Sequence, residues 1–349
     1  MGPRGEIEWV YHAGRDQGIV WAYDIDPMPS GDLFVTATKR QRTLFFVLDP
    51  TTGRVVWSEQ LDLVDTHDAD LLDEHRILIA NMRNYDPDTG INKDRLVIYN
   101  RTSGEYGWEW RFDGRFPRDG GGTYSDDWTH VNDVDRIGPG RYLASVRNFD
   151  QVIVVDRETG AIVNRLGRDD RSSVLKEQHN PQYLETADGQ ATVLVADSEN
   201  DRVVEYERGA LGWTRTWELG DAETLAWPRD ADRLPTGNTL VTDSANNRVI
   251  EVTPDGEIVW EFSAPWLVYD AERMAHGDEA GGPTIREQGM VGAYELIDGE
   301  PPSMAAQSAC AAVLRNWTRA SAERTETSTL TPTARPTTGS PTTEEQRAD

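Results

Sequence analysis

The sequence is poor in cysteine, in lysine and in long apolar runs, and each shortage excludes a class of protein. The single cysteine, Cys310, excludes a framework of intramolecular disulfides. No apolar run reaches the roughly 18 residues that a membrane-spanning helix needs, and the first residues lack the pattern of a signal peptide. We therefore expect no membrane-spanning segment in this chain, and the compartment stays open.

Basic residues are scarce as a group. The chain has 61 Asp and Glu against 35 Lys and Arg, a formal net charge of −26, and its only lysines are Lys39, Lys93 and Lys176. Binding to nucleic acid or to an anionic membrane requires a basic face, so both are excluded as partners. An acidic, lysine-poor composition is typical of proteins that work in concentrated salt, although a GC-rich genome would also favour arginine over lysine.

A repeat runs through most of the chain. Four copies carry Asp-x-Asp, and seven residues after the second Asp a β-rich run begins, with turn residues between the two elements. This order predicts a hairpin of two strands, and each copy continues with two more strands, of which the last often ends in Trp. The four pairs are 24–26, 68–70, 133–135 and 230–232, and a fifth copy begins at His179.

Four antiparallel strands per repeat predict an all-β fold, a β-propeller over residues 5–300 with five complete blades between about residues 19 and 262. Residues 5–11 closely copy residues 256–262, an outer strand, so we expect a sixth blade that joins this N-terminal strand to strands after residue 264. Otherwise its inner strands were encoded upstream and the ring is incomplete. Residues 301–349 are rich in Thr, Ser and Pro, which predicts a disordered tail.

Polar side chains gather at the starts of the first strands, which line the channel of a propeller. The Asp-x-Asp pairs also recur in blades without histidine, so we expect them to cap turns and to bind backbone amides. Histidines at strand ends often only join neighbouring blades, but three in register with an Asn and Arg residues predict an active or binding site. Alignment of the copies predicts one layer of Tyr23, His67, Asn132 and Arg229, a second layer of Trp21, His130, His179 and Trp227, and Arg83 and Arg147 reaching the same space from second strands.

These motifs resemble the arylsulfotransferase family, the aryl-sulfate sulfotransferases built on a six-bladed propeller. The resemblance spans about residues 20–262, and the acidic composition resembles that of a haloarchaeal member. The most specific string is Trp128-Thr-His-Val-Asn132 with Ser145-Val-Arg147 downstream. The motifs that carry it are Thr66-His67-Asp68, Asp127-Trp128-Thr129-His130-Val131-Asn132, Ser145-Val146-Arg147, Gln178-His179 and Leu234-Pro-Thr-Gly-Asn-Thr-Leu-Val241.

The resemblance implies a sulfuryl transfer from an aryl sulfate to a phenolic acceptor through a sulfated His179. It implies that His67, His130, Asn132 and Arg147 hold the sulfuryl group, that no cofactor or metal takes part, and that the protein works outside the cytoplasm or tethered to a membrane. Trp21, Trp128, Trp227 and Tyr23 offer rings for aryl stacking. Arg229 departs from the small hydroxylated residue that the family favours, which puts the acceptor pocket in doubt.

The residues alone leave open two alternatives to a sulfuryl-transfer function. Three histidines around one channel could hold Zn²⁺ with an open position for water, although the guanidinium of Arg147 beside a dication argues against it. A non-catalytic binding or surface module is the other alternative. The identity of donor and acceptor and the oligomeric state are not encoded in any motif.

The excess of acidic residues generates the first prediction. At about 0.01 M salt the Debye length is roughly 30 Å, so repulsion acts across the whole molecule, and molar salt screens it. We expect the melting temperature to rise between about 0.05 M and about 3 M KCl, measured by circular dichroism. A melting temperature that does not change across this range would contradict the prediction.

Overall fold

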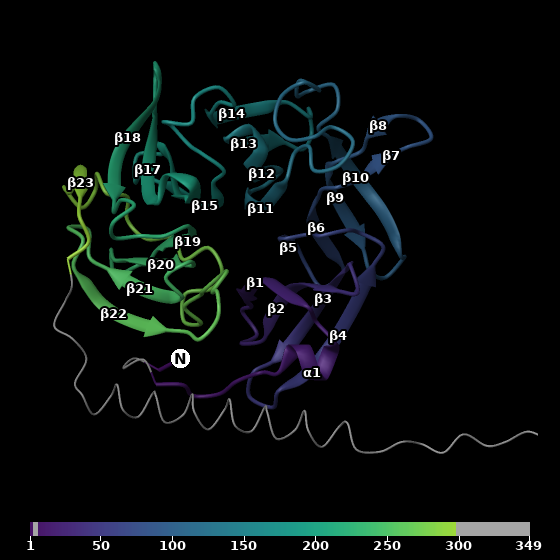
Figure 1. Cartoon of the computed structure of the whole chain (residues 1–349), viewed down its shortest axis with the longest axis horizontal. Coiled ribbons are helices and arrows are strands. Elements are labelled where there is room, and N and C mark those ends of the chain that lie inside the picture. The colour runs from purple at the N-terminus through teal and green to yellow at the C-terminus, as the bar shows by residue number, and fades with distance from the viewer. Residues whose placement is uncertain (3–5, 298–349) are drawn as a thin grey trace, which may run out of the picture. The chain divides into compact units, whose positions relative to one another are not determined.

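The computed structural model describes residues 1–2 and 6–297, and its compact unit that begins at Trp9 holds five antiparallel β-sheets arranged around an axis (Figure 1). Each of them contains a meander of four antiparallel strands, to which the fourth sheet adds one parallel strand, so the all-β propeller and its five blades are confirmed. The first strands β1, β5, β11, β15 and β19 lie nearest the axis (Figure 1).

The first three sheets take their strands from residues 21–167. A two-stranded hairpin, β7 and β8, is inserted between the second and third strands of the second sheet. The strands are β1 (Trp21–Pro27), β2 (Leu33–Lys39), β3 (Arg42–Asp49) and β4 (Arg54–Leu61); then β5 (Ala69–Leu71), β6 (Arg76–Asn81), β7 (Tyr85–Asp86), β8 (Ile91–Asn92), β9 (Arg95–Asn100) and β10 (Glu105–Arg111); then β11 (Val131–Gly138), β12 (Arg141–Val146), β13 (Gln151–Asp156) and β14 (Ile162–Gly167).

The last two sheets follow the same order. The helical elements of the described chain are a five-residue helix and two single 3₁₀ turns. The strands are β15 (His179–Glu185), β16 (Ala191–Asp197), β17 (Arg202–Gly209) and β18 (Gly212–Leu219), then β19 (Pro228–Arg233), β20 (Thr239–Asp243), β21 (Arg248–Val252) and β22 (Ile258–Ser263), with β23 (Gly292–Tyr294); the helical elements are α1 (Ala13–Gln17), η1 (Arg147–Phe149) and η2 (Ser198–Asn200).

The burial of each strand follows its place in the blade. The second strands are buried on both faces, as in β6 and β16, because neighbouring blades pack on either side of them. The outer strands β4, β14 and β22 alternate between exposed and more buried residues, since only one face packs on a neighbour. The apolar core is therefore divided into clusters between successive sheets.

The sixth blade differs from the prediction. Residues 6–12 belong to no strand, so the outer strand predicted at residues 5–11 is wrong for the part that the structure describes. After residue 264 the only strand within the described range is β23, and it pairs in parallel with β18 of the fourth sheet. The predicted tail, residues 301–349, lies outside the described residues.

Residues 264–291, which we call the closing segment, contain no strand and contact the first, fourth and fifth sheets. The Asp270 carboxylate accepts a hydrogen bond of 2.8 Å from the backbone N–H of Ile25 in β1. On the other side the segment contacts Glu205 of β17, which accepts hydrogen bonds from the backbone N–H of Ile285 and pairs with Arg233 of β19 at 3.2 Å. Side-chain contacts rather than a β-ladder therefore hold this segment.

The buried Glu205–Arg233 pair generates a prediction about stability. Both side chains are at most 1 % exposed, and removing one partner of a buried ion pair costs about 3 kcal/mol or more. We expect Glu205→Gln to lower the free energy of unfolding by about 3 kcal/mol, measured by denaturant titration in concentrated salt.

The matched control is Glu207→Gln on the same strand. Glu207 also pairs with a residue of the closing segment, Arg286, but that guanidinium is 53 % exposed. Surface pairs contribute about 0–1 kcal/mol, so this variant should be nearly neutral. Equal losses in the two variants would contradict the role assigned to the buried pair.

Candidate active site

A pocket of about 250 Å³ lies where the inner segments meet the axis. Its walls combine three aromatic rings, two imidazoles and two guanidinium groups drawn from separate segments of the chain. Its lining residues are Trp21, Tyr23, His67, His130, Arg147, Arg229 and Tyr269.

A backbone bend fixes which residues face the axis. Four inner segments contain a residue with positive φ, and the side chain two positions later enters the central layer. This places His179 in the layer of His67, because the bend in its segment falls at Glu177 (φ 47°). The predicted pairing of His179 with His130 and Trp227 is therefore wrong by two residues. The bends lie at Asp65, His130, Glu177 and Trp227, and the residues that follow them by two are His67, Asn132, His179 and Arg229.

Tyr269, which the sequence analysis missed, completes this layer. It belongs to the closing segment and is 7 % exposed. Its local sequence Tyr269-Asp270-Ala271-Glu272 is a sixth copy of the inner-strand motif, with Glu in place of the second Asp, as comparison with His67-Asp-Ala-Asp70 shows. The signal was present, but no hairpin follows it.

Hydrogen bonds join this layer into one chain. Arg229 Nη1 donates to the Tyr269 hydroxyl at 3.1 Å, and the hydroxyl donates to His67 Nδ1 at 2.9 Å. His67 Nε2 then lies 3.5 Å from Asp65, which also accepts a hydrogen bond of 2.5 Å from the Tyr23 hydroxyl. The directions follow from the network, since a neutral imidazole has one donor and one acceptor nitrogen.

The electrostatics favour a neutral His67 beside an ionised Asp65. Burial lowers the pKa of His67 to about 4, although Asp65 acts in the opposite direction. Burial alone would raise the pKa of Asp65, but hydrogen bonds from His67 and Tyr23 and the charge of Arg83 outweigh it, so that pKa lies below its usual range. Burial, and then the hydrogen bond to Asp65, raise the pKa of Tyr23, which keeps its phenol protonated.

His179 is fully buried at the start of β15. Its Nδ1 lies 2.8 Å from the hydroxyl of Ser198, which itself donates to the carbonyl of Pro228 at 2.7 Å. The Ser198 oxygen therefore accepts from Nδ1–H, and the lone pair of Nε2 faces Arg229 Nη1, which donates to it. Burial, and then the positive charges of Arg229 and Arg147, hold the pKa of His179 well below its ordinary value, so the ring is neutral.

His130 lines the pocket as part of a second carboxylate–imidazole pair. Its Nδ1 lies 2.8 Å from Asp127, and Arg83 contacts the same carboxylate oxygen at 3.3 Å. Burial lowers the pKa of His130, partly offset by Asp127. The ring of His130 also packs edge-on against His67, with centroids 5.0 Å apart.

The remaining predicted residues divide between the pocket and the core. Arg147 lines the pocket and pairs with Glu177, while Asn132 is buried and donates to the backbone carbonyl of Gln178 at 2.9 Å, next to His179. Trp128 does not line the pocket: it is completely buried between Tyr124 and Phe149, so its predicted stacking on substrate is replaced by a packing role.

The ligand geometry does not match the zinc alternative. In the described chain, the groups of three side chains whose ligand atoms lie within 4.8 Å of one another consist of carboxylates only. Each channel histidine contacts another group: His179 contacts Ser198, His130 contacts Asp127, and His67 contacts Tyr269.

No helix among the described residues is long and apolar enough to cross a membrane.

The fold and this layer together define a β-propeller with an axial pocket lined by imidazoles, guanidinium groups and aromatic rings. The family model for arylsulfotransferase (ASST) matches residues 4–214, well over half of the chain. The chain therefore belongs to the arylsulfotransferase family, as its motifs indicated.

The other comparisons are more distant. A search of curated proteins finds no match. Similar solved structures include regucalcin, a calcium-binding protein from Agrobacterium tumefaciens (12% identity, 71% of this chain and 75% of that chain covered, TM-score 0.49). Virginiamycin B lyase from Staphylococcus aureus is another (13% identity, 70% of this chain and 70% of that chain covered, TM-score 0.43). A third is a protein of unknown function from Bacteroides caccae (13% identity, 70% of this chain and 81% of that chain covered, TM-score 0.47).

The Asp127–His130 pair generates a prediction for the titration of the imidazole. Asp127 and Asp65 raise the pKa of His130, whereas burial and Arg147 lower it, and burial dominates. We expect His130 to titrate below 6.5 in the folded protein, followed by NMR of histidine-labelled protein. Asp127→Asn should lower this pKa further, because it removes the charge that favours the imidazolium.

The matched control is Asp126→Asn. Asp126 is the neighbouring carboxylate, is 71 % exposed, and pairs with Arg83 rather than with His130. Its loss should leave the His130 titration almost unchanged. A His130 pKa at or above 6.5 in the wild type would show that desolvation does not dominate there.

Proposed function

We propose that the protein transfers a sulfuryl group from an aryl sulfate to a phenolic acceptor by two displacements at His179. The observation that carries this proposal is the position of His179, whose Nε2 contacts Arg229 while Ser198 holds the other nitrogen. A neutral imidazole is a competent nucleophile, and membership of the arylsulfotransferase family supports this class of reaction.

In the first displacement Nε2 of His179 attacks the sulfur of the aryl sulfate. The N–S bond forms as the bond between sulfur and the aryl oxygen breaks, and the phenoxide leaves. Arg229 now contacts Nε2, so the incoming group must take its place on that nitrogen, after which the guanidinium can bind the sulfuryl oxygens. Arg147 supplies a second positive charge from the same pocket, which stabilises the negative oxygens during transfer.

In the second displacement the oxygen of the acceptor phenol attacks the same sulfur and the N–S bond breaks. We assign His130 as the base that takes the phenolic proton, because it lines the pocket, is neutral, and is oriented by Asp127. The proton then passes to the next departing phenoxide or to solvent, so the cycle balances without a cofactor.

The aromatic wall of the pocket suits an aryl substrate. Trp21 and Tyr23 line it with centroids 6.0 Å apart, and Tyr23 also stacks on His67 at 4.0 Å. Trp227 lies beneath Arg229, whose guanidinium carbon is 3.5 Å from the centroid of the ring. We propose that Trp21 and Tyr23 bind the ring of donor and acceptor in turn, while Trp227 holds Arg229 in place.

The nucleophile is tested by the mass of the intact protein after exposure to 4-nitrophenyl sulfate without acceptor. The wild type should gain the mass of one sulfuryl group, and peptide mapping should place it on His179. His179→Asn should gain none, because an amide cannot carry the group. His130→Asn should still be sulfated but should transfer the group to phenol at least about 100-fold more slowly, a loss typical of a missing general base.

The control is His75→Asn, which alters an exposed histidine on the turn before β6 and should behave as wild type. A sulfuryl group mapped to His130, or turnover by His179→Asn, would show that His179 is the wrong nucleophile. Absence of both adduct and turnover in folded wild type would favour the non-catalytic binding module.

A further inference from the structure

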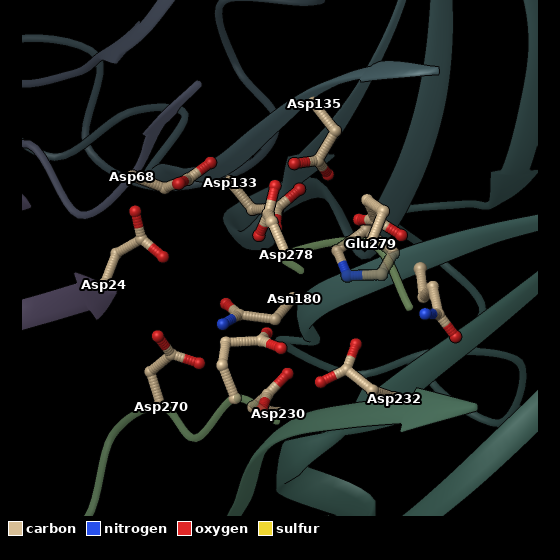
Figure 2. Close-up of a pocket in the computed structure, with 13 residues that line it drawn as sticks. Asp24, Asp68, Asp133, Asp135, Asn180, Asp230, Asp232, Asp270, Asp278 and Glu279 are labelled. Atoms are coloured by element: carbon tan, nitrogen blue, oxygen red, sulfur yellow. The ribbon is translucent and has the colours of Figure 1, made fainter. Parts of the chain in front are cut away.

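A second cavity lies on the axis, separate from the pocket that His67 and His130 line. It measures about 30 Å³, and ten of its thirteen lining residues are Asp or Glu. The other three are Asn180, Pro181 and Gln182, so no positively charged side chain faces it from the described residues. Figure 2 shows the labelled carboxylates of several inner segments turned toward this one space.

Several of these carboxylates are buried without a partner. Asp133 Oδ1, Asp135 Oδ2 and Asp232 Oδ2 have no hydrogen-bond partner, and the three residues are 5 %, 8 % and 5 % exposed. A buried carboxylate oxygen without a donor is costly unless a proton or a cation neutralises it.

Six of the carboxylates form two groups with the spacing of metal ligands. One group is Asp68, Asp133 and Asp135, the other is Asp230, Asp270 and Glu272, and in each the ligand oxygens lie within 4.8 Å of one another. Oxygens that surround one Ca²⁺ at about 2.4 Å are at most about 4.8 Å apart. A cavity of this volume admits about two water-sized occupants, which agrees with two groups.

We propose that this axial cavity binds two divalent cations of the calcium type, one at each of the two carboxylate groups. Ligands that are all oxygen favour Ca²⁺ over Zn²⁺, which prefers nitrogen and sulfur. Asp133 and Asp135 bring unpartnered oxygens to the first site. The inference is independent of the proposed sulfuryl transfer, because no step of that reaction uses these ions.

Each site joins two segments that are far apart in the sequence. The first links Asp68 to β11, and the second links β19, through Asp230, to the closing segment, through Asp270 and Glu272. Asp270 directly follows Tyr269, whose hydroxyl contacts His67 and Arg229 in the central layer of the active site. A cation at the second site would therefore fix the closing segment where its tyrosine completes that layer.

The test uses the full chain in concentrated KCl after dialysis against EDTA. We expect calorimetry with CaCl₂ and elemental analysis after gel filtration to give two Ca²⁺ per chain, and the melting temperature to rise with Ca²⁺. Asp133→Asn and Asp270→Asn should each lose one ion and at least about tenfold in affinity at their own site. The control Asp62→Asn, whose carboxylate is 80 % exposed, should bind as wild type.

If either variant fails to fold, Asp135→Asn and Glu272→Gln report on the same two sites. Wild type that retains no Ca²⁺ and has the same melting temperature in EDTA and in CaCl₂ would overturn the proposal in favour of protons or K⁺ in the cavity. Calcium binding that survives in both Asp133→Asn and Asp270→Asn would overturn it as well, since the ions would then lie elsewhere.

Discussion

The arrangement around the axis depends on a hydrogen bond that the backbone N–H of one inner segment donates to a carboxylate of the neighbouring inner segment. Asp70 accepts from the N–H of Arg136 at 2.9 Å, and Asp270 accepts from that of Ile25 at 2.8 Å. Gln182 plays the same part for Arg233 at 2.7 Å. The repeated Asp-x-Asp motif thus binds backbone amides, as the sequence predicted, but amides of the neighbouring segment rather than of its own turn.

This contact has an electrostatic consequence. The inner segments that use a carboxylate for this hydrogen bond also direct acidic side chains toward the same axis, into a cavity of about 30 Å³ that holds too little water to screen their repulsion well. Burial, and then the neighbouring carboxylates, raise the pKa of Asp133 and Asp135 well above its ordinary value. The geometry that joins the blades therefore creates a demand for positive charge in the middle of the molecule. Directly before the first carboxylate, the same segments present imidazole, guanidinium and phenol groups instead, as in His67-Asp68, Arg229-Asp230 and Tyr269-Asp270.

Local patterns were sufficient to predict the five blades, because a hairpin is encoded by neighbouring residues. They also brought His67, His130, Arg147 and Arg229 to one pocket, since register along a strand is local. The position of His179 was misjudged because Asn180-Pro181-Gln182 stands where the other copies have Asp-x-Asp, so the pair that aligned those copies was missing there.

The larger errors concern contacts between segments. Tryptophan is a residue type that stacks on aryl rings, so Trp128 was predicted to contact substrate. Its packing against Tyr124 and Phe149 is known only from the folded structure. Tyr269 was missed because its motif lacks the following hairpin by which the other copies were recognised. The sixth blade was expected to close by strand pairing, whereas the closing segment reaches the first sheet through a side chain, the carboxylate of Asp270, which accepts from the backbone N–H of Ile25.

The mode of closure links the stability of the ring to the completeness of the site. Tyr269 is the only member of the described hydrogen-bonded layer that comes from a segment without β-ladder partners of its own, and it joins Arg229 to His67. A strand in a blade is held at every second residue, but Tyr269 is held through Asp270 on one side and through Ile285 on the other. The closing segment therefore has no β-ladder to resist local opening, and side-chain contacts together with single backbone hydrogen bonds, such as that from the N–H of Gly282 to the carbonyl of Arg233, hold it instead. Such opening would separate Arg229 from His67, so the integrity of the pocket depends on how firmly the closing segment is held.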